Sequence, residues 1–303
     1  MNRRTFTQAL ATAALSAAVP PLPAAPASGA TSPKAPPFPL SVMLWTVFTD
    51  LPFEERLAKV AEAGYNNIQL VGEYNAKNWS PADFDRANTA RKRLDIRFDA
   101  TAGLKNGVSV PAQRDAFLAE LREALTPMET LSCPAMIVLS GDVVPGVSRE
   151  QQHQASIETL KRAAALVEGR QIDGQPVRLL LECIHREERP RYFLTSAAEA
   201  IDVVRAVNHP QVQFLYDIFH EQMTEGNLIE KLDKHIDVIG LIHVADVPGR
   251  HEPGSGEINY VNIYRKLAQL NYRHNAAMEF RPSGEPVATL RAAKTLALRS
   301  AEA

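Results

Sequence analysis

Short apolar runs alternate with longer amphipathic stretches along most of the chain. The amphipathic stretches carry apolar residues at helical spacing, and one opens on Ser80 and Pro81, a common helix start. The pattern predicts a strand followed by a helix, repeated eight times. The predicted strands cover residues 41–45, 67–71, 96–100, 135–139, 177–182, 212–217, 238–243 and 276–279.

Eight strand–helix units predict a parallel sheet, because each helix returns the chain to the start of the next strand. The span from residue 40 to residue 303 matches the roughly 250 residues that are usual for a (β/α)8 barrel. An open, doubly wound sheet is the alternative, but the sequence lacks the glycine-rich phosphate loop typical of it. We therefore predict one α/β domain over residues 40–303, a single (β/α)8 TIM barrel.

The residues before the barrel have the composition of an export signal. Arg3 and Arg4 precede Phe6, an uncharged run over 9–19 and small residues at 25–27 that suit cleavage. We expect a twin-arginine signal peptide over 1–27 and a flexible, proline-rich lead-in over 28–39. The protein would then be exported folded, to the periplasm or outside the cell.

Composition narrows the classes of partner. The chain of 303 residues is 45% hydrophobic and 22% charged, with a formal net charge of −2 and no basic block. Nucleic acid is therefore not an expected partner. No run reaches the roughly 18 apolar residues needed to span a bilayer, so we expect no membrane association after cleavage. A small-molecule substrate is the expected partner, and a homo-oligomer is left open.

Four of the predicted strands end at residues that can bind a metal: Glu182, Asp217, His243 and Glu279. In a TIM barrel the carboxyl-terminal strand ends converge on the active site. Because strand side chains alternate between faces, all four can point inward. The apolar residues two positions earlier would then point inward as well: Leu180, Leu215, Leu241 and Ala277.

Each of these residues also has a purely structural interpretation. A single glutamate at a strand end is usually exposed or ion-paired, and a single histidine in an apolar strand usually belongs to the core. Four ionisable groups in one apolar barrel would be costly to bury without a common partner. Three carboxylates and one imidazole favour a single Mn²⁺ or Mg²⁺ ion, with Co²⁺ as a further candidate.

Two other stretches place polar groups near these strand ends. His220 lies three residues after Asp217, and a Gly/Pro-rich loop over 246–259 holds Arg250, His251 and Glu257. The structural alternative is an ordinary surface loop, but a loop that follows a barrel strand and carries Arg and His suits the binding of substrate oxygens. Trp45 follows the first strand and could line the substrate pocket or simply pack in the core.

Two segments resemble the hydroxypyruvate isomerase family and the related ketose 3-epimerases, within the xylose-isomerase-like barrels. Residues 216–220, YDIFH, are close to that family's YDIYH, and residues 252–260, EPGSGEINY, are close to its EPGTGEINY. The resemblance is densest over 180–282. It implies that the four strand-end residues hold the metal and that Glu182 and Glu279 transfer the proton. It also implies that Glu188, His220 and Arg250 contact the substrate.

The predicted reaction is the isomerisation of a small sugar or hydroxy-keto acid, of the hydroxypyruvate to tartronate semialdehyde type. A carboxylate would remove an acidic C–H proton, the metal would stabilise the cis-enediolate, and a carboxylate would return the proton. His243 matches the 3-epimerases, whereas the hydroxypyruvate isomerases have Gln there. His185 also stands where Asn is common.

The sequence leaves several alternatives open. The same site could serve a ketose 3-epimerase or a keto-sugar lyase, and the chain could be a non-catalytic periplasmic sugar-binding barrel. A phosphodiesterase is disfavoured, because it would need more metal-ligating histidines and a basic surface.

Overall fold

The computed structural model describes residues 37–71 and 79–302. The predicted signal peptide and most of the predicted lead-in lie outside these residues, so both stay predictions. The predicted catalytic domain falls almost entirely within them.

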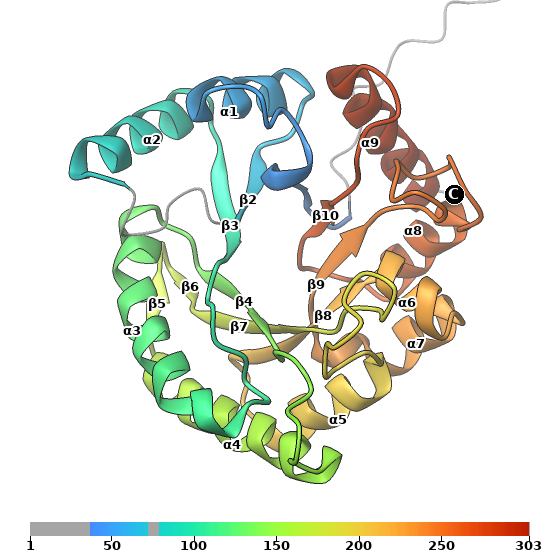
Figure 1. The fold of residues 1–303 in the computed structure, drawn as a ribbon. Helices are drawn as coiled ribbons and strands as arrows, with labels where there is room; N and C mark the ends of the chain where they lie inside the picture. The colour runs from blue at the N-terminus through green and yellow to red at the C-terminus, as the bar shows by residue number, and fades with distance from the viewer. Residues whose placement is uncertain (1–36, 72–78, 303) are drawn as a thin grey trace, which may run out of the picture. The chain divides into compact units, whose positions relative to one another are not determined.

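Eight parallel strands of the described chain close into one barrel (Figure 1), which confirms the predicted fold. Around the ring the strands follow the order β1-β10-β9-β8-β7-β4-β3-β2, with β1 beside both β10 and β2. Each predicted strand is present, with boundaries that differ by at most two residues. The barrel strands are β1 (Leu40–Met43), β2 (Asn67–Val71), β3 (Arg97–Ala102), β4 (Ala135–Leu139), β7 (Arg178–Glu182), β8 (Val212–Asp217), β9 (Ile239–Val244) and β10 (Ala276–Met278).

Helices surround the ring of strands (Figure 1). Ser80 and Ser148 begin two of them with reciprocal capping boxes, in which the side chain of the capping serine accepts a backbone N–H of the first turn. The α-helices are α1 (Phe53–Glu62), α2 (Pro81–Arg93), α3 (Arg114–Thr130), α4 (Arg149–Val167), α5 (Ala197–Val207), α6 (Ile218–Thr224), α7 (Leu228–His235), α8 (Tyr260–Gln269) and α9 (Pro286–Glu302).

Some short elements were not predicted from the sequence. The helix α6 begins directly after β8, and a hairpin of β5 (Gln171–Ile172) and β6 (Gln175–Pro176) precedes β7. Single 3-10 turns occur at η1 (Leu44–Thr46), η2 (Pro111–Gln113) and η3 (Ile236–Val238). Within the described chain, no helix combines the length and apolar character that a bilayer crossing requires.

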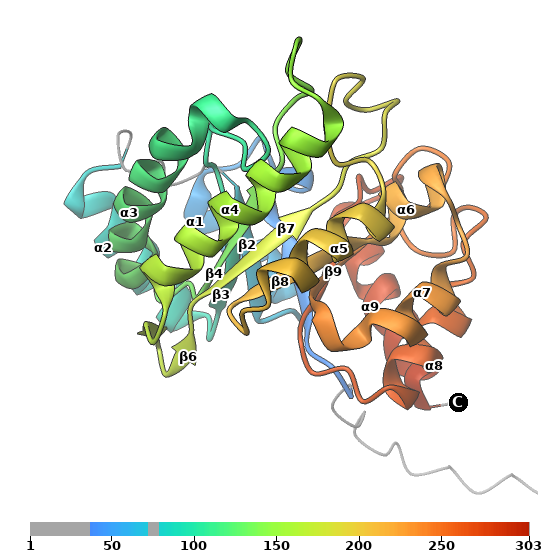
Figure 2. The same ribbon diagram turned by 90° about the horizontal axis from the view of Figure 1, so that it is seen from below.

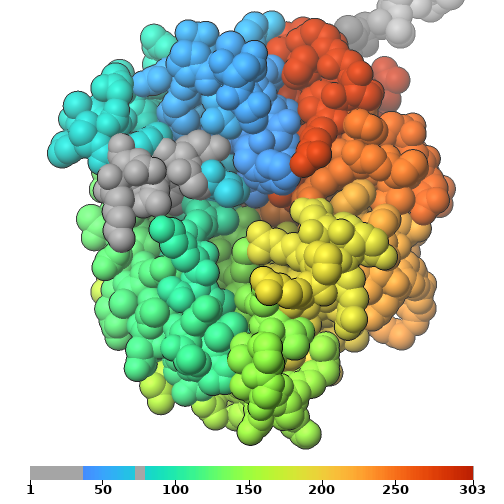
Figure 3. Space-filling model, viewed as in Figure 1, coloured from blue at the N-terminus to red at the C-terminus, as the bar shows by residue number. Residues whose placement is uncertain are grey.

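The two ends of the barrel differ. The loops that follow β4 and β7 project from one end, and the β5–β6 hairpin lies at the other (Figure 2). Figure 3 looks onto the end with the long loops, where a hollow at the centre is bordered by the blue segment after β1 and the yellow segment after β7. The carboxyl-terminal ends of the strands lie at this end of the barrel.

Apolar side chains form two groups, one on each side of the ring of strands. The larger group fills the layer between strands and helices. The smaller group fills the interior of the ring and includes the four residues whose inward direction was predicted from strand alternation, which confirms that prediction: Leu180, Leu215, Leu241 and Ala277.

Candidate active site

The four strand-end residues predicted as metal ligands lie together inside the barrel. Glu182 ends β7, Asp217 ends β8, His243 lies in β9 and Glu279 directly follows β10. Each residue offers one ligand atom, and these four atoms all lie within 4.8 Å of one another. All four side chains are buried, and the most exposed residue, Glu182, keeps only 8% of its surface. The structure therefore brings three carboxylates and one imidazole to a single point.

The strand register explains why these residues meet. Asp217 pairs with His243 across β8 and β9, and His243 pairs with Ala277 on β10. Glu279 follows Ala277 by two residues, so it occupies the next inward position along the strand. The apolar residues inside the ring lie one inward position below the ligands, which leaves the ionisable groups at the carboxyl-terminal end of the barrel.

Burial and mutual charge perturb all four groups. Burial, with the charges of Glu279 and Asp217 nearby, raises the pKa of Glu182 to about 8. Burial also raises the pKa of Asp217. It opposes ionisation of Glu279 as well, but His243 and Arg250 hold the pKa of that carboxyl well below its usual range. Burial alone would lower the pKa of His243, yet the surrounding carboxylates, Glu279 first, raise it to about 9.

The contacts of His243 Nδ1 fit a bound cation. This nitrogen is buried and has no partner in hydrogen-bond geometry. Oε2 of Glu279 lies 2.7 Å from it, Oε1 of Glu182 lies 3.8 Å away and Oδ2 of Asp217 lies 4.0 Å away. A nitrogen and three carboxylate oxygens that face one another at this range suit a shared divalent ion. The residues present therefore fit the predicted metal.

Arg250, predicted to contact substrate, lies beside this cluster. Its Nη1 donates to both carboxylate oxygens of Glu188, at 3.1 and 2.8 Å, and its Nη2 donates to Oε2 of Glu279 at 2.8 Å and to Oδ2 of Asp217 at 3.4 Å. The guanidinium carbon lies 5.5 Å from the ring centre of Trp45 and 5.2 Å from that of Phe219. Arg250 thus compensates three carboxylates while aromatic rings cover it.

Trp45, predicted to line the pocket, bonds directly to a candidate proton carrier. Its indole Nε1 donates to Oε1 of Glu279 at 2.8 Å. Because Arg250 donates to the other oxygen, both oxygens of Glu279 have a fixed donor. These two bonds fix the carboxylate plane of Glu279 in the site.

His220 lies at the start of α6, whose position depends on Asp217. Oδ1 of Asp217 accepts from the backbone N–H groups of Phe219 and His220, at 2.8 and 3.2 Å, and so caps the helix. Nε2 of His220 lies 3.3 Å from Oδ2 of Asp217. Its Nδ1 lies 2.7 Å from Nδ1 of His185, which therefore also belongs to the site. Burial, together with Arg250, lowers the pKa of His220 to about 3, so this ring is neutral.

The loop after β9 owes its shape to Asp246. This buried carboxylate accepts from the backbone N–H groups of Val247 at 2.9 Å, Gly254 at 2.9 Å, Gly256 at 3.0 Å and Ile258 at 3.0 Å. Gly256 is needed there, since a Cβ at that position would lie 2.0 Å from the carbonyl oxygen of Val247.

Only part of that loop contributes to the site. Arg250 reaches the cluster, whereas Nδ1 of His251 contacts the carbonyl of Arg281 and Glu257 accepts from Gln222 at the surface. Of the three polar residues that the sequence analysis named in this loop, only Arg250 lies beside the cluster, and its contact with a substrate stays a prediction.

Two residues that the sequence analysis did not single out, Gln69 and Asp99, continue the hydrogen-bond network from the Nε2 side of His243. Oε1 of Gln69 lies 2.8 Å from Nε2 of His243, and the amide of Gln69 donates to Asp99. Both residues are buried in the barrel interior. The one signal in the sequence is a polar residue in the middle of a short strand, which also occurs on solvent-facing positions and is therefore weak.

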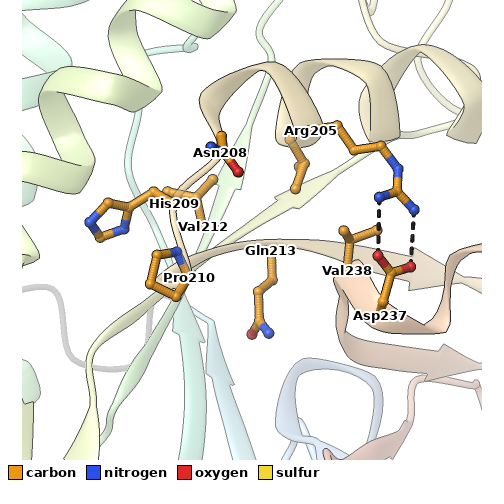
Figure 4. A pocket seen from close by; sticks show the side chains of 9 residues that line it. Arg205, Asn208, His209, Pro210, Val212, Gln213, Asp237 and Val238 are labelled. Carbon is orange, nitrogen blue, oxygen red and sulfur yellow. Dashed lines mark hydrogen bonds and ion pairs between the residues drawn. The ribbon is translucent and has the colours of Figure 1, made fainter.

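A separate surface pocket lies at the opposite end of the barrel and has a volume of about 500 Å³ (Figure 4). Arg205 and Asp237 at its edge form a two-pronged ion pair, with both nitrogen–oxygen distances at 3.0 Å. The pocket contains none of the residues of the carboxylate cluster or its neighbours in the candidate active site. Its lining consists of Val204, Arg205, Asn208, His209, Pro210, Val212, Gln213, Asp237 and Val238.

Comparisons with known proteins agree on one kind of barrel. The model of the family described as "Xylose isomerase-like TIM barrel" matches residues 57–299. A putative hydroxypyruvate isomerase of Danio rerio is 31% identical, over 80% of this chain and 90% of its own length. A 2-oxo-tetronate isomerase of Haemophilus influenzae is 30% identical, over 82% of this chain and 95% of its own length. The crystal structure of an AP endonuclease, family 2, from Brucella melitensis superposes with a TM-score of 0.74 at 25% sequence identity. The match covers 84% of this chain and 97% of that chain.

Proposed function

The chain belongs to the xylose isomerase-like TIM-barrel family and is an isomerase, and we propose that it is a metal-dependent aldose–ketose isomerase of a small hydroxy-carbonyl compound. The proposed reaction is of the hydroxypyruvate to tartronate semialdehyde type. The observation that carries the proposal is the convergence of Glu182, Asp217, His243 and Glu279 within one buried cluster. We propose Mn²⁺ or Mg²⁺ as the resident ion, because carboxylate-rich sites suit hard cations.

The reaction moves one carbon-bound proton and one hydroxyl proton, and it needs no external oxidant or reductant. A base removes the proton from the carbon that bears the hydroxyl, the proton returns to the neighbouring carbon, and the hydroxyl proton passes between the two oxygens. When bound, a divalent cation supplies stabilisation for the negative charge that develops on those oxygens.

Glu182 and Glu279 suit the two halves of the proton transfer. In the protein without a metal ion, His243 and Arg250 hold the pKa of Glu279 well below its usual range, whereas burial raises the pKa of Glu182 to about 8. Two carboxyl groups whose pKa values are pushed apart are typical of an acid–base pair. We therefore assign Glu279 as the base and Glu182 as the group that returns the proton in one direction of the reaction, with the roles exchanged in the reverse direction.

Three further residues suit the binding of substrate oxygens. Arg250 and His220 carry N–H groups beside the carboxylate cluster, and Glu188 fixes the guanidinium of Arg250 through two hydrogen bonds. Arg250 lies under aromatic rings and is mostly shielded from water, so its hydrogen bonds to a substrate would be strong. His220 is neutral and can donate or accept one hydrogen bond at Nε2.

A ketose 3-epimerase or a keto-sugar lyase would use the same groups, and their products distinguish them from an isomerase. The test is an NMR screen of hydroxy-keto acids and small sugars in deuterated water, with Mn²⁺-loaded protein removed before each spectrum is recorded. An isomerase moves the carbonyl and incorporates deuterium at the carbon that receives the proton. An epimerase inverts a stereocentre beside an unmoved carbonyl, and a lyase releases a fragment or water.

The screen also separates catalysis from simple binding. Protein treated with a chelator serves as the control and should give no exchange. Absence of deuterium incorporation with every compound in the loaded protein, together with measurable sugar binding, would favour the non-catalytic sugar-binding barrel.

A further inference from the structure

A chain of buried polar side chains extends from His243 across the barrel interior. Nε2 of His243 lies 2.8 Å from Oε1 of Gln69 on β2. Nε2 of Gln69 donates to Oδ2 of Asp99 on β3 at 3.1 Å, and Oγ of Ser41 on β1 donates to Oδ1 of Asp99 at 2.6 Å. All four residues are buried, and Gln69 and Ser41 are completely so. None of the comparisons or motifs assigns a role to Gln69, Asp99 or Ser41.

The donors and acceptors along this chain of side chains determine which ring nitrogen of His243 carries a hydrogen. Both carboxyl oxygens of Asp99 accept a hydrogen bond, one from the hydroxyl of Ser41 and the other from the amide NH₂ of Gln69. The amide of Gln69 must then turn its carbonyl oxygen toward His243. A carbonyl oxygen can only accept, so Nε2 of His243 must carry the hydrogen. Nδ1 is left to face the three carboxylates.

The backbone deviates from regular pairing at the point where Asp99 enters the barrel. Ile68 pairs with Phe98, but the next residue of β2, Gln69, pairs with Ala100. Asp99 is therefore the extra residue of a bulge in β3. Bulges turn a side chain away from the face that strict alternation would give it, and they recur beside active sites. Here the bulge allows the carboxylate of Asp99 to reach Gln69.

We propose that Gln69, oriented by Asp99 and Ser41, is a positioning residue that keeps the hydrogen of His243 on Nε2 and so presents Nδ1 to the bound cation. This inference rests on the proposed metal site. Histidine ligands commonly donate their second ring N–H to a fixed acceptor, which sets the tautomer and the ring orientation. Removing such an acceptor typically weakens metal binding about 10- to 100-fold.

The first test determines which ring nitrogen of His243 carries the hydrogen, and it uses a variant only to assign the signals. Protein labelled with ¹⁵N-histidine and loaded with diamagnetic Mg²⁺ is examined by two-dimensional NMR, and the His243 signals are assigned by their loss in His243→Gln. The expected result is a hydrogen on Nε2 and a shifted resonance for Nδ1. A hydrogen found on Nδ1 of His243 in the loaded protein would overturn the inference.

The second test measures Mn²⁺ affinity by competition with a chelator. Gln69→Leu and Asp99→Leu should each weaken Mn²⁺ binding about 10- to 100-fold, although neither residue is a ligand. Asp99→Asn should bind close to the wild type, because its amide oxygen can still accept from Gln69. Gln152→Leu is the matched control: Gln152 is a fully buried glutamine whose side chain bonds only to backbone groups outside the site, so Mn²⁺ affinity should not change.

The outcomes separate this inference from the function on which it rests. If the wild type fails to bind one Mn²⁺ per chain, the proposed metal site is wrong. If the wild type binds Mn²⁺ and Gln69→Leu binds it within about threefold of the wild type, the metal site stands and the positioning role of Gln69 is refuted.

Discussion

The ion pairs of Arg250 indicate how the site would change when a metal ion binds. In the described structure it donates to Glu188, Glu279 and Asp217, so a single guanidinium compensates three carboxylates. A divalent cation held by Asp217 and Glu279 would take over part of that compensation. Nη2 of Arg250 would then be available to a substrate oxygen, while Glu188 would still hold Nη1. Arg250 therefore suits a group that exchanges a protein partner for a substrate partner.

The first prediction concerns the two proposed proton carriers. Glu182→Gln and Glu279→Gln keep the size of the side chain but remove the base, so each should lower turnover by at least about 100-fold, the low end for general acid–base catalysis. Because both residues are also proposed ligands, initial rates must be measured at saturating Mn²⁺, with metal content determined for each variant. Near-normal turnover in either fully loaded variant would exclude that residue as a proton carrier.

At the scale of single elements, local signals were sufficient for most of the barrel. Most strands are apolar runs between turn residues, and Ser80 marked a helix start that the structure confirms with a capping box. The ligand positions could also be predicted, because strand alternation is a local rule.

The bulge that aims Asp99 could not be predicted in this way, since it depends on how β3 pairs with β2, residues far apart in sequence. Gln69 was missed for the same reason: its partner His243 is 174 positions away. The helix α6 was missed because its start depends on Asp217, which the sequence showed only as a strand end and a candidate ligand.

The second prediction concerns the loop after β9. Asp246→Ala leaves four backbone N–H groups without their acceptor, so the free energy of unfolding should fall by at least about 2 kcal/mol. Arg250 lies on this loop, so KM should rise as well. Glu257→Ala is the control, because Glu257 is an exposed residue of the same loop and should change stability by less than about 0.5 kcal/mol. Equal denaturant midpoints for the two variants would contradict the anchoring role of Asp246.

The whole molecule places its buried ionisable groups unevenly. The proposed ligands and Arg250 gather at the carboxyl-terminal end of the barrel, above the apolar residues inside the ring. Without a cation, protons must offset part of the negative charge, as the raised pKa values of Glu182 and His243 show. The stability of the metal-free barrel should therefore depend on pH in a way that the loaded barrel does not share.

The third prediction gives the sign of that dependence. The folded-state pKa of Glu182 is about 8, above its ordinary 4.5, and that of His243 is about 9, above its ordinary 6.5. A raised pKa stabilises the fold at low pH, and this contribution is lost as pH rises through the folded value. His220, whose pKa is lowered to about 3, contributes an opposite change that is complete above about pH 6.5. Between pH 7 and pH 9 the metal-free protein should therefore become less stable.

Melting temperatures measured at pH 7, 8 and 9, with chelator and with Mn²⁺, check this prediction. The decrease should be largest in the chelated protein and smaller in Glu182→Gln, which lacks one of the two titrating groups. A melting temperature that rises over this range in the chelated protein, or an identical slope with Mn²⁺, would contradict it.

The closure of the barrel between β1 and β10 also has a kinetic consequence. The cluster needs β7 through β10, and the contact of Gln69 with His243 also needs β2, which faces β9 across the interior of the closed ring. We expect closure of the ring to follow the transition state for folding, so that a cation gains its full set of contacts only after it. Interactions absent from the transition state slow unfolding and leave the folding rate unchanged. Binding of the metal ion would thus slow unfolding and lengthen the lifetime of the native state, without making the chain fold faster.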